Sequence, residues 1–472
     1  MKNIIYILAL IVLVSCKEST ESKQIVKEIA PISDVVLENA VIYEANIRQY
    51  SVEGTFNAFT KDIPQLKELG VKIIWVMPIF PISETRRKAT GGDFASLIKD
   101  PEARKKALGS YYAVSDFTKV NPEFGTKDDF RNLLKTAHDN GIYVILDWVP
   151  NHTGWDHTWL KTNSEFYTKN SKGEITDPLN PEGISVGWAD VADLNYDSKG
   201  LRTAMIEDML YWVKEENIDG FRCDVAGSVP TDFWQEAIPK LRASKDIFML
   251  AEAWEPELMK DNLFEMAYGW DTHHKMNSIA QGKETVKDWD SRMNQIDEMY
   301  QEDDILMNFI TNHDENSWNG SVKERMGGAS EAMLALSYAA PGMPLIYSGQ
   351  EYDLDKRLLF FEKDTIIRNK GKVWPLLEKL GALKTNYKAF NGGKKAASYL
   401  RLETSNNDAI LAFEREKEDE KFIYIANLSA KPVTFKPTFS GEFKEALTGV
   451  KVILKNGEEV SFGSWEYHIL VK

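Results

Sequence analysis

The chain has 472 residues, which exceeds a single ordinary hydrophobic core and predicts two or three domains. Hydrophobic residues make up 43% and aromatic residues 11% of it, enough to fill a large globular interior. The net charge of −15 argues against nucleic acid or an anionic membrane surface as a partner, because either would repel the protein. An uncharged polymer such as a carbohydrate carries no such penalty.

The N-terminus has the pattern of an export signal. Lys2 provides a positive start, residues 4–14 are almost wholly apolar, and the run ends at Cys16. Such a run is too short to span a bilayer as a permanent helix. The ending resembles a bacterial lipobox, which predicts a lipoprotein signal peptide at 1–15, followed by a lipidated cysteine and flexible tether at 16–36.

A lipid on Cys16 predicts an exported protein that is anchored to a membrane without spanning it. The outer membrane is the expected site, with the protein facing the periplasm or the cell surface. The alternative is an ordinary secretory signal in which this cysteine is incidental. The other cysteine of the chain is Cys223, so no intramolecular disulfide is expected after processing.

Between residues 37 and 390, short β-rich runs alternate with amphipathic helical stretches, which is typical of a parallel α/β fold. Several of the runs are continuously apolar, as expected for strands covered on both faces. Eight strands are predicted, at 41–47, 72–78, 142–148, 220–224, 247–252, 264–270, 305–312 and 344–348. Helices are predicted at 130–140 and 201–216. Eight strand–helix repeats predict a (β/α)8 TIM barrel as the catalytic domain.

Two inserts and a C-terminal region complete the predicted organisation. The inserts, 82–110 and 152–190, follow the second and third strands, so they should shape the catalytic face of the barrel. From 391 to 472 the pattern changes to short alternating strands, which predicts a separate antiparallel β-sandwich domain. Its predicted strands are 398–403, 409–414, 421–427, 451–454 and 467–471.

Carboxylates follow several predicted barrel strands. Asp224, Glu252 and Asp314 end the fourth, fifth and seventh strands, and a polar cluster from Asp147 to His152 ends the third. Because the carboxyl ends of barrel strands share one rim, these groups should converge. A single Asp at a strand end is usually a helix cap. Four clusters on one rim instead indicate an active site, since burying charge is costly.

Paired carboxylates on a concave surface are the groups that glycosidic bond cleavage requires. Asp224 is predicted to be the nucleophile, held ionised by Arg222, which lies two residues earlier on the same strand face. Glu252 is predicted to be the proton donor, with its pKa raised by two neighbouring alanines and Trp254.

In this order, the four clusters resemble the four signature regions of the α-amylase family of glycoside hydrolases, over nearly the whole mature chain. The resemblance implies a retaining mechanism with Asp224 as nucleophile, Glu252 as acid/base and Asp314 as the third carboxylate, which binds sugar hydroxyls. It also implies that 152–190 is the family's small domain B. The residues expected to bind substrate are Tyr112, His152, Arg222, His313 and Trp254.

Two departures from the family pattern concern ligand binding. Many family α-amylases carry Lys-His three and four residues after the nucleophile, where this chain has Gly227 and Ser228, so the aglycone subsites must differ. Asn151 and Asp193 match usual ligands of a structural calcium ion, but the third ligand element does not match. The resemblance therefore implies calcium only in part, and the chemistry itself requires no cofactor.

The leading hypothesis is hydrolysis of α-1,4-glucosidic bonds, with α-1,6 bonds as a further option, in maltodextrins, starch or glycogen fragments. Transglycosylation on the same site is the alternative, because it differs only in whether water or a sugar accepts the glucosyl-enzyme. A non-catalytic α-glucan-binding lipoprotein is a hypothesis from another class. It predicts the loss of at least one carboxylate, and all three are present.

Overall fold

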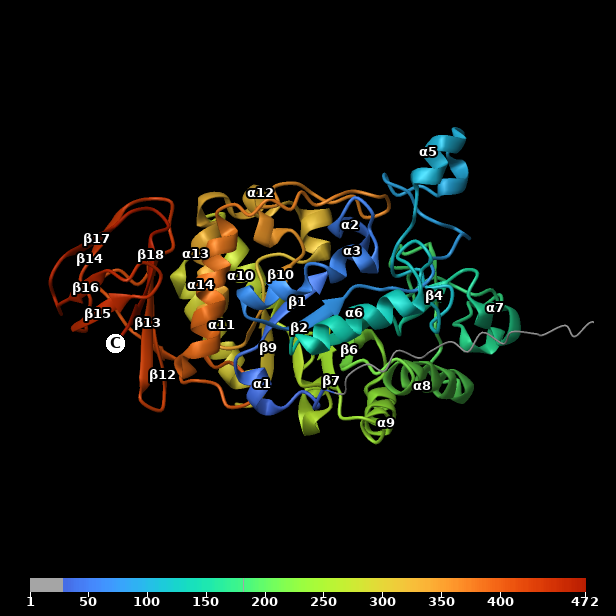
Figure 1. The fold of residues 1–472 in the computed structure, drawn as a ribbon, viewed down its shortest axis with the longest axis horizontal. Coiled ribbons are helices and arrows are strands. Elements are labelled where there is room, and N and C mark those ends of the chain that lie inside the picture. Colours follow the sequence, from blue (N-terminus) through green and yellow to red (C-terminus); the bar gives the residue numbers. More distant parts are fainter. Residues whose placement is uncertain (1–28, 181) are drawn as a thin grey trace, which may run out of the picture.

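The computed structural model describes residues 29–180 and 182–472, which form a barrel, an insert and a C-terminal sheet (Figure 1). The predicted signal peptide, Cys16 and most of the predicted tether lie outside these residues. Within the described ranges, no helix combines the length and the hydropathy that a membrane crossing requires.

Eight parallel strands close the barrel in the order β1-β10-β9-β8-β7-β6-β3-β2. They are β1 (Val41–Ala45), β2 (Val71–Val76), β3 (Tyr143–Trp148), β6 (Gly220–Cys223), β7 (Phe248–Ala251), β8 (Met266–Tyr268), β9 (Ile305–Asn308) and β10 (Met343–Tyr347). The predicted (β/α)8 barrel is confirmed, with all eight strands in place. Most strands end earlier than predicted, because the polar residues after each apolar run turn out of the sheet into the rim loops.

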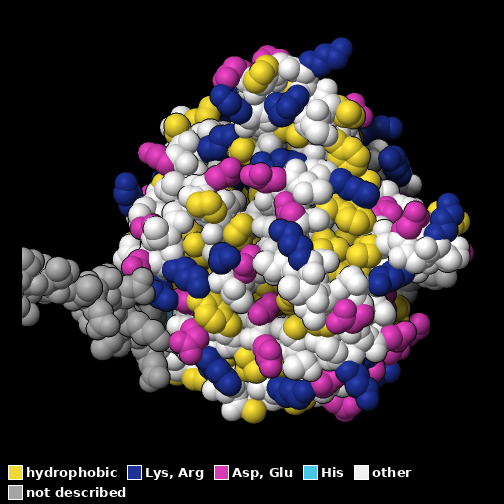
Figure 2. Space-filling model, turned by 90° about the vertical axis from the view of Figure 1, so that its right-hand side faces the viewer, with side chains coloured by type: hydrophobic (Ala, Val, Ile, Leu, Met, Phe, Trp, Pro, Cys, Tyr) yellow, Lys and Arg dark blue, Asp and Glu magenta, His cyan; other side chains and the backbone are white. Residues whose placement is uncertain are grey.

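The two predicted inserts lie together at one end of the molecule, at the right-hand side of Figure 1. The insert after β2 carries α5 (Pro101–Lys106), and the insert after β3 contains β4 (His152–Gly154) and α7 (Thr158–Thr162). β5 (Val191–Asp193) follows directly after its predicted end. β4 and β5 pair antiparallel. Figure 2 turns this end toward the viewer and shows charges of both signs interspersed with hydrophobic patches.

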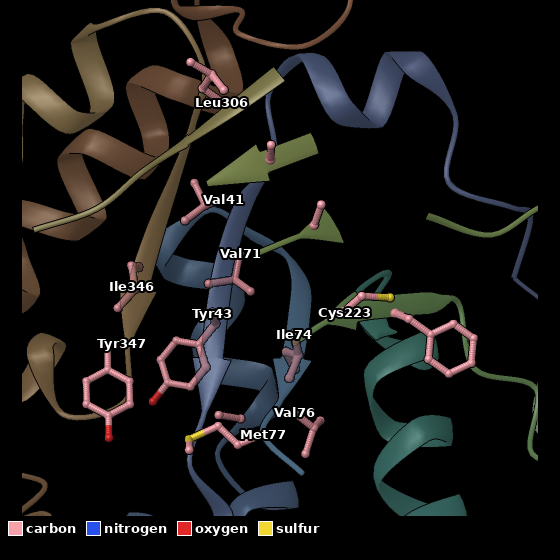
Figure 3. Packing of buried hydrophobic residues seen from close by; sticks show 14 of the residues in the cluster. Val41, Tyr43, Val71, Ile74, Val76, Met77, Cys223, Leu306, Ile346 and Tyr347 are labelled. Carbon is pink, nitrogen blue, oxygen red and sulfur yellow. The ribbon is translucent and has the colours of Figure 1, made fainter. Parts of the chain in front are cut away.

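Side-chain alternation along the barrel strands separates two buried clusters. Ile42 and Ile73 belong to the cluster inside the barrel, whereas Val41 and Ile74, their neighbours in sequence, belong to the cluster shared with the surrounding helices. Figure 3 shows part of the outer cluster, where Tyr43 projects from β1 among side chains of adjacent strands. The barrel interior is therefore a packed core, and the catalytic groups must lie at its rim.

Helices surround the barrel. The longer ones are α6 (Lys127–Asp139), α8 (Lys199–Lys214), α9 (Thr231–Arg242), α10 (Trp270–Ala280), α11 (Val286–Met299), α13 (Ser330–Ala339) and α14 (Val373–Asn386). Shorter ones are α1 (Asp34–Glu38), α2 (Ile47–Tyr50), α3 (Phe56–Thr60), α4 (Ile63–Leu66) and α12 (Val322–Met326). The two predicted helices correspond to α6 and α8. α6 begins at a capping box in which Thr126 and Asp129 each accept the other's backbone N–H.

The C-terminal region is an antiparallel sheet in the order β11-β12-β13-β18-β15-β16, with a two-stranded sheet, β14-β17, beside it. Its strands are β11 (Leu400–Arg401), β12 (Ile410–Lys417), β13 (Glu420–Asn427), β14 (Val433–Phe435), β15 (Gly441–Glu445), β16 (Lys451–Leu454), β17 (Val460–Phe462) and β18 (Tyr467–Val471). One buried cluster contains side chains from both sheets, as expected for the predicted sandwich.

Candidate active site

A buried polar layer closes the top of the barrel interior. Asp147 of β3 and Arg222 of β6 lie opposite each other in register, and Arg222 Nη1 donates to Asp147 Oδ1 at 2.8 Å. Asp147 Oδ2 accepts from Trp75 Nε1 at 3.0 Å and from the Tyr112 hydroxyl at 3.1 Å. Asp147 is thus the centre of this layer. The sequence placed it at a strand end, but its partners lie 35 to 75 residues away and were not predicted.

The Arg222 guanidinium also contacts both main catalytic candidates. Its Nη1 donates to Asp224 Oδ1 at 2.8 Å, as predicted from their spacing. Its Nη2 lies 2.6 Å from Glu252 Oε2, although outside hydrogen-bond alignment. Nε donates to the Tyr268 hydroxyl at 3.1 Å. One fully buried cation is therefore shared among several carboxylates.

The pKa of Asp224 is raised although Arg222 pairs with this carboxylate. The pKa is about 6. Burial raises it, the Arg222 charge lowers it, and the neighbouring Asp147 carboxylate raises it. The predicted ion pair forms and lowers this pKa, but burial has the larger effect. Desolvation outweighs the attraction because the whole group is enclosed by protein.

Glu252 has the raised pKa that a proton donor needs, for a reason that was only partly predicted. The pKa of Glu252 is about 7. Burial raises it, the Arg222 charge lowers it, and the charges of Asp224 and Asp314 raise it. The ring of Trp254 is half exposed and stacks on Trp270 at a centroid distance of 5.7 Å.

The third carboxylate, Asp314, lies beside a charged histidine. His313 Nδ1 is 2.5 Å from Glu44 Oε1, and its Nε2 is 2.8 Å from the Tyr112 hydroxyl and 3.4 Å from Asp314 Oδ2. Burial lowers the pKa of His313, but the charges of Asp314 and Glu44 have the larger combined effect, and the pKa is raised to about 9. His313 is therefore an imidazolium near neutral pH, with both ring nitrogens available as donors.

A cavity of about 770 Å³ opens above this layer, large enough for several sugar units. Of the predicted residues, it is lined by Asp224, Glu252, Asp314, Tyr112, His152 and His313. Arg222 lies beneath it. Trp254 does not line this cavity, and its role in substrate binding stays a prediction. The tryptophan lies on the loop after β7, which turns it outward onto Trp270.

Aromatic side chains that the sequence did not single out form much of the wall. Trp188 of the insert is 5.7 Å from the His152 ring, and Phe360 lies nearly parallel to Tyr112 at 6.4 Å. Trp318, which is half exposed, also lines the cavity. Such flat apolar faces suit the faces of sugar rings. Nothing in their local sequence distinguishes these residues from the many aromatic residues of the core.

Asn151 and Asp193 lie near each other at the base of the insert, since His152 pairs with Asp193 and Leu194 N donates to Asn151 O at 3.2 Å. Calcium takes six to eight oxygen ligands, usually with several carboxylates. Among residues 29–180 and 182–472, no group of three or more His, Cys, Asp or Glu side chains could hold a metal ion. The described carboxylates at this position therefore do not by themselves make up a calcium ligand set.

The barrel and the buried carboxylates around a sugar-sized cavity define a glycoside hydrolase. The sequence matches the family described as "Alpha amylase, catalytic domain" over residues 17–176 and 184–374, and the chain belongs to this family. It is a retaining α-glucan hydrolase of the amylase type.

Two solved structures are similar over 92% of this chain and 99% of theirs: a noncanonic maltogenic alpha-amylase from Thermotoga neapolitana (TM-score 0.80, 26% identity) and an alpha-amylase from Lactobacillus plantarum (0.78, 27%). Alpha-amylase 3 of Dictyoglomus thermophilum is 24% identical over 86% of this chain and 88% of its own length.

Proposed function

We propose that Asp224, Glu252 and Asp314 carry out retaining cleavage of α-1,4-glucosidic bonds in maltodextrins, starch or glycogen fragments. The observation that carries this proposal is the shared contact of Arg222 with both Asp224 and Glu252 at the floor of one cavity. Nucleophile and acid are thereby held side by side, and the acid has the higher pKa of the two.

In the first step Glu252 gives its proton to the glycosidic oxygen as the bond from that oxygen to the anomeric carbon breaks. Asp224 forms an ester bond to the same carbon, using Oδ2, since Arg222 holds Oδ1. Glu252, now ionised, then takes a proton from water, and the resulting hydroxide displaces the ester oxygen. The sugar leaves with its original anomeric configuration, and both carboxyl groups regain their starting states.

The test compares Asp224→Asn, Glu252→Gln and Asp314→Asn with wild type on maltoheptaose. Each should lower kcat/KM by several orders of magnitude, on the order of 10⁴-fold for the nucleophile. Asp232→Asn is the matched control, because this aspartate is exposed and pairs with Arg202 on the outer helices. If wild type releases no more product than Asp224→Asn, the proposal fails.

Transglycosylation remains a second candidate because the aglycone side is unusual. The place where a Cβ on Gly227 would lie is only 2.3 Å from Glu255 Oε2, so a carboxylate fills the space beside this residue. A relative that is 27% identical over 66% of this chain is a 4-alpha-glucanotransferase of Thermotoga neapolitana. Products on maltotriose distinguish the two reactions, since early oligosaccharides longer than the substrate would indicate transfer. Pullulan tests for α-1,6 cleavage.

We also propose that the protein is exported and anchored by a lipid on Cys16, on the strength of the apolar run that ends at this residue. Wild type should partition into the detergent phase of a Triton X-114 extract, and Cys16→Ala should remain in the aqueous phase. Partition of both forms into the aqueous phase would favour an ordinary secretory signal. A separate measurement concerns calcium. Because the described carboxylates near Asn151 and Asp193 do not by themselves make up a calcium ligand set, we expect equal melting temperatures with and without EDTA.

A further inference from the structure

The turn that follows Asp314 brings an indole N–H back to its carboxylate. Glu315–Asn319 form a single π-helical turn, and within it Trp318 Nε1 donates to Asp314 Oδ1 at 3.2 Å. The other carboxylate oxygen, Oδ2, lies 3.4 Å from His313 Nε2. Oδ1 of Asp314 therefore accepts a hydrogen bond from the turn, and Oδ2 lies in ion-pair contact with the preceding histidine.

The turn itself is attached to the long loop between β10 and α14. The Asn316 side chain bonds to this loop in both directions, as donor at 3.0 Å and as acceptor at 2.9 Å. The Trp318 ring packs against Phe360 at 5.0 Å and Phe361 at 5.8 Å, and Arg357 Nη1 donates to the Trp318 carbonyl at 3.3 Å. The indole is thus held by this loop as well as by Asp314.

Asp314 needs such a partner more than the other two carboxylates do. Its side chain is 37% exposed, against 11% for Asp224 and 10% for Glu252, both of which also contact Arg222. An exposed carboxylate samples several rotamers in water, and a catalytic group must be held close to one geometry to be effective. The nearest hydrogen-bond donor that could fix Oδ1 is the indole of Trp318.

We propose that Trp318 is a positioning residue, whose indole N–H holds Asp314 in the orientation that binds the sugar at the scissile bond. The inference rests on the proposed function of Asp314 and assigns to Trp318 a task beyond lining the cavity. The aromatic face of Trp318 and its N–H then have separable effects. The face contributes to substrate binding, and the N–H contributes to the rate of the chemical step.

The first test is Trp318→Phe, which keeps an aromatic ring against Phe360 and removes the N–H. We expect kcat on maltoheptaose to fall about tenfold, the size of effect that a lost hydrogen bond to a charged group produces, with KM changed less than about twofold. Trp374→Phe is the matched control. It removes an indole N–H that also donates to a carboxylate, Glu378 Oε1 at 2.9 Å, but on α14 and outside the cavity lining, so kcat and KM should both be retained.

A double-mutant cycle with Asp314→Ala decides whether the effect passes through this carboxylate. Trp318→Phe should cause no further loss of kcat when Asp314 is already absent. An equal loss in both backgrounds, or an effect on KM alone, would overturn the inference. Full activity of Asp314→Ala would instead refute the proposed function of Asp314, so the two failures are distinguishable. Melting temperatures of all variants ensure that every comparison is made between folded proteins.

Discussion

Arg222 sets the charge balance of the cavity at the scale of single residues. Its fully buried guanidinium faces Asp147, Asp224 and Glu252. One cation cannot neutralise three carboxylates, and their mutual repulsion together with burial raises the pKa of each. A proton is therefore retained within the group near neutral pH, and Glu252, with the highest pKa of the three, is the residue that carries it.

This arrangement predicts a bell-shaped dependence of kcat/KM on pH. Asp224 must be ionised to attack, so activity should fall as the pH drops through about 6. Glu252 must be protonated to donate, so activity should also fall as the pH rises through about 7. The maximum should lie between these values, measured at constant ionic strength on maltoheptaose. Because these carboxylates titrate as a coupled set, the apparent pKa of each limb describes the set and not a single residue. Constant activity from pH 5 to pH 9 would contradict the assignment.

A second prediction concerns the Glu44–His313 pair. His313 is surrounded by the carboxylates of Glu44, Asp314 and Asp147, the Tyr112 hydroxyl, the Arg222 guanidinium and the Trp75 ring. Two carboxylate charges raise the pKa of His313 to about 9, and Glu44→Gln removes one of them. The pKa of His313 should therefore fall toward neutrality. The imidazole should then lose its proton at a lower pH, which NMR titration of the ring would show.

Glu351→Gln is the control for this change. Glu351 is also fully buried, but it accepts a hydrogen bond from Tyr43 at 2.6 Å and does not contact the histidine. The His313 titration should be unchanged in Glu351→Gln. A His313 pKa that stays near 9 in Glu44→Gln would show that Asp314 alone keeps this imidazole charged.

The sequence identified those site residues whose signal is local. Asp224, Glu252 and Asp314 each follow an apolar strand, and the shared rim of a barrel brings them together. Glu44 and Trp318 could not be assigned in this way, and Asp147 was placed on the rim without its partners. Their roles come from contacts between strands and loops that are far apart in the chain, and a local pattern contains no information about such contacts.

At the scale of elements, the barrel strands were predictable because both their faces are buried, which produces continuous apolar runs. The C-terminal strands β14, β15 and β17 were missed. β15 reads Gly-Glu-Phe-Lys-Glu, with buried and exposed residues alternating over only five positions. So short an alternation resembles a polar loop, and these strands form because β18 and the facing sheet supply their partners.

The junction between barrel and sheet depends on Arg415 of β12. This side chain is fully buried and donates to four backbone carbonyls, among them Ala339 at the end of α13 and Asn391 at the start of the C-terminal region. Burial lowers its pKa to about 9. No carboxylate among residues 29–180 and 182–472 bonds to it, so its contribution is hydrogen bonding of carbonyls that water cannot reach.

We therefore expect Arg415→Ala to lower the free energy of unfolding by about 3–5 kcal/mol, since it leaves several buried carbonyls unpaired and opens a cavity. Chemical denaturation followed by fluorescence gives this quantity. Lys451→Ala, which removes an exposed ion pair with Glu442 on the same sheet, should change it by less than about 1 kcal/mol. Equal effects of the two substitutions would show that Arg415 contributes no more than a surface residue.

At the scale of the whole molecule, the C-terminal sheet takes part in two cores. Phe413 and Tyr424 belong to the large cluster that fills the space around the barrel, and the Tyr424 hydroxyl donates to Ala332 O of α13 at 2.9 Å. Phe443 and Phe462 belong to the separate cluster shared with β14 and β17. One sheet thus joins the barrel core to the sandwich core through its opposite faces.

This continuity predicts that barrel and sheet unfold together. Only Trp465 among the 13 tryptophans lies after residue 390, so tryptophan fluorescence reports mainly on the barrel. Phe413→Ala, on the barrel-facing side, should destabilise the protein by about 3–5 kcal/mol. Phe443→Ala, which lies in the sandwich core, should lower the same fluorescence midpoint, because a cooperative unit loses stability wherever it is weakened. A fluorescence midpoint that responds to Phe413→Ala but not to Phe443→Ala would mean that the sandwich core unfolds on its own. Circular dichroism would in that case show two transitions.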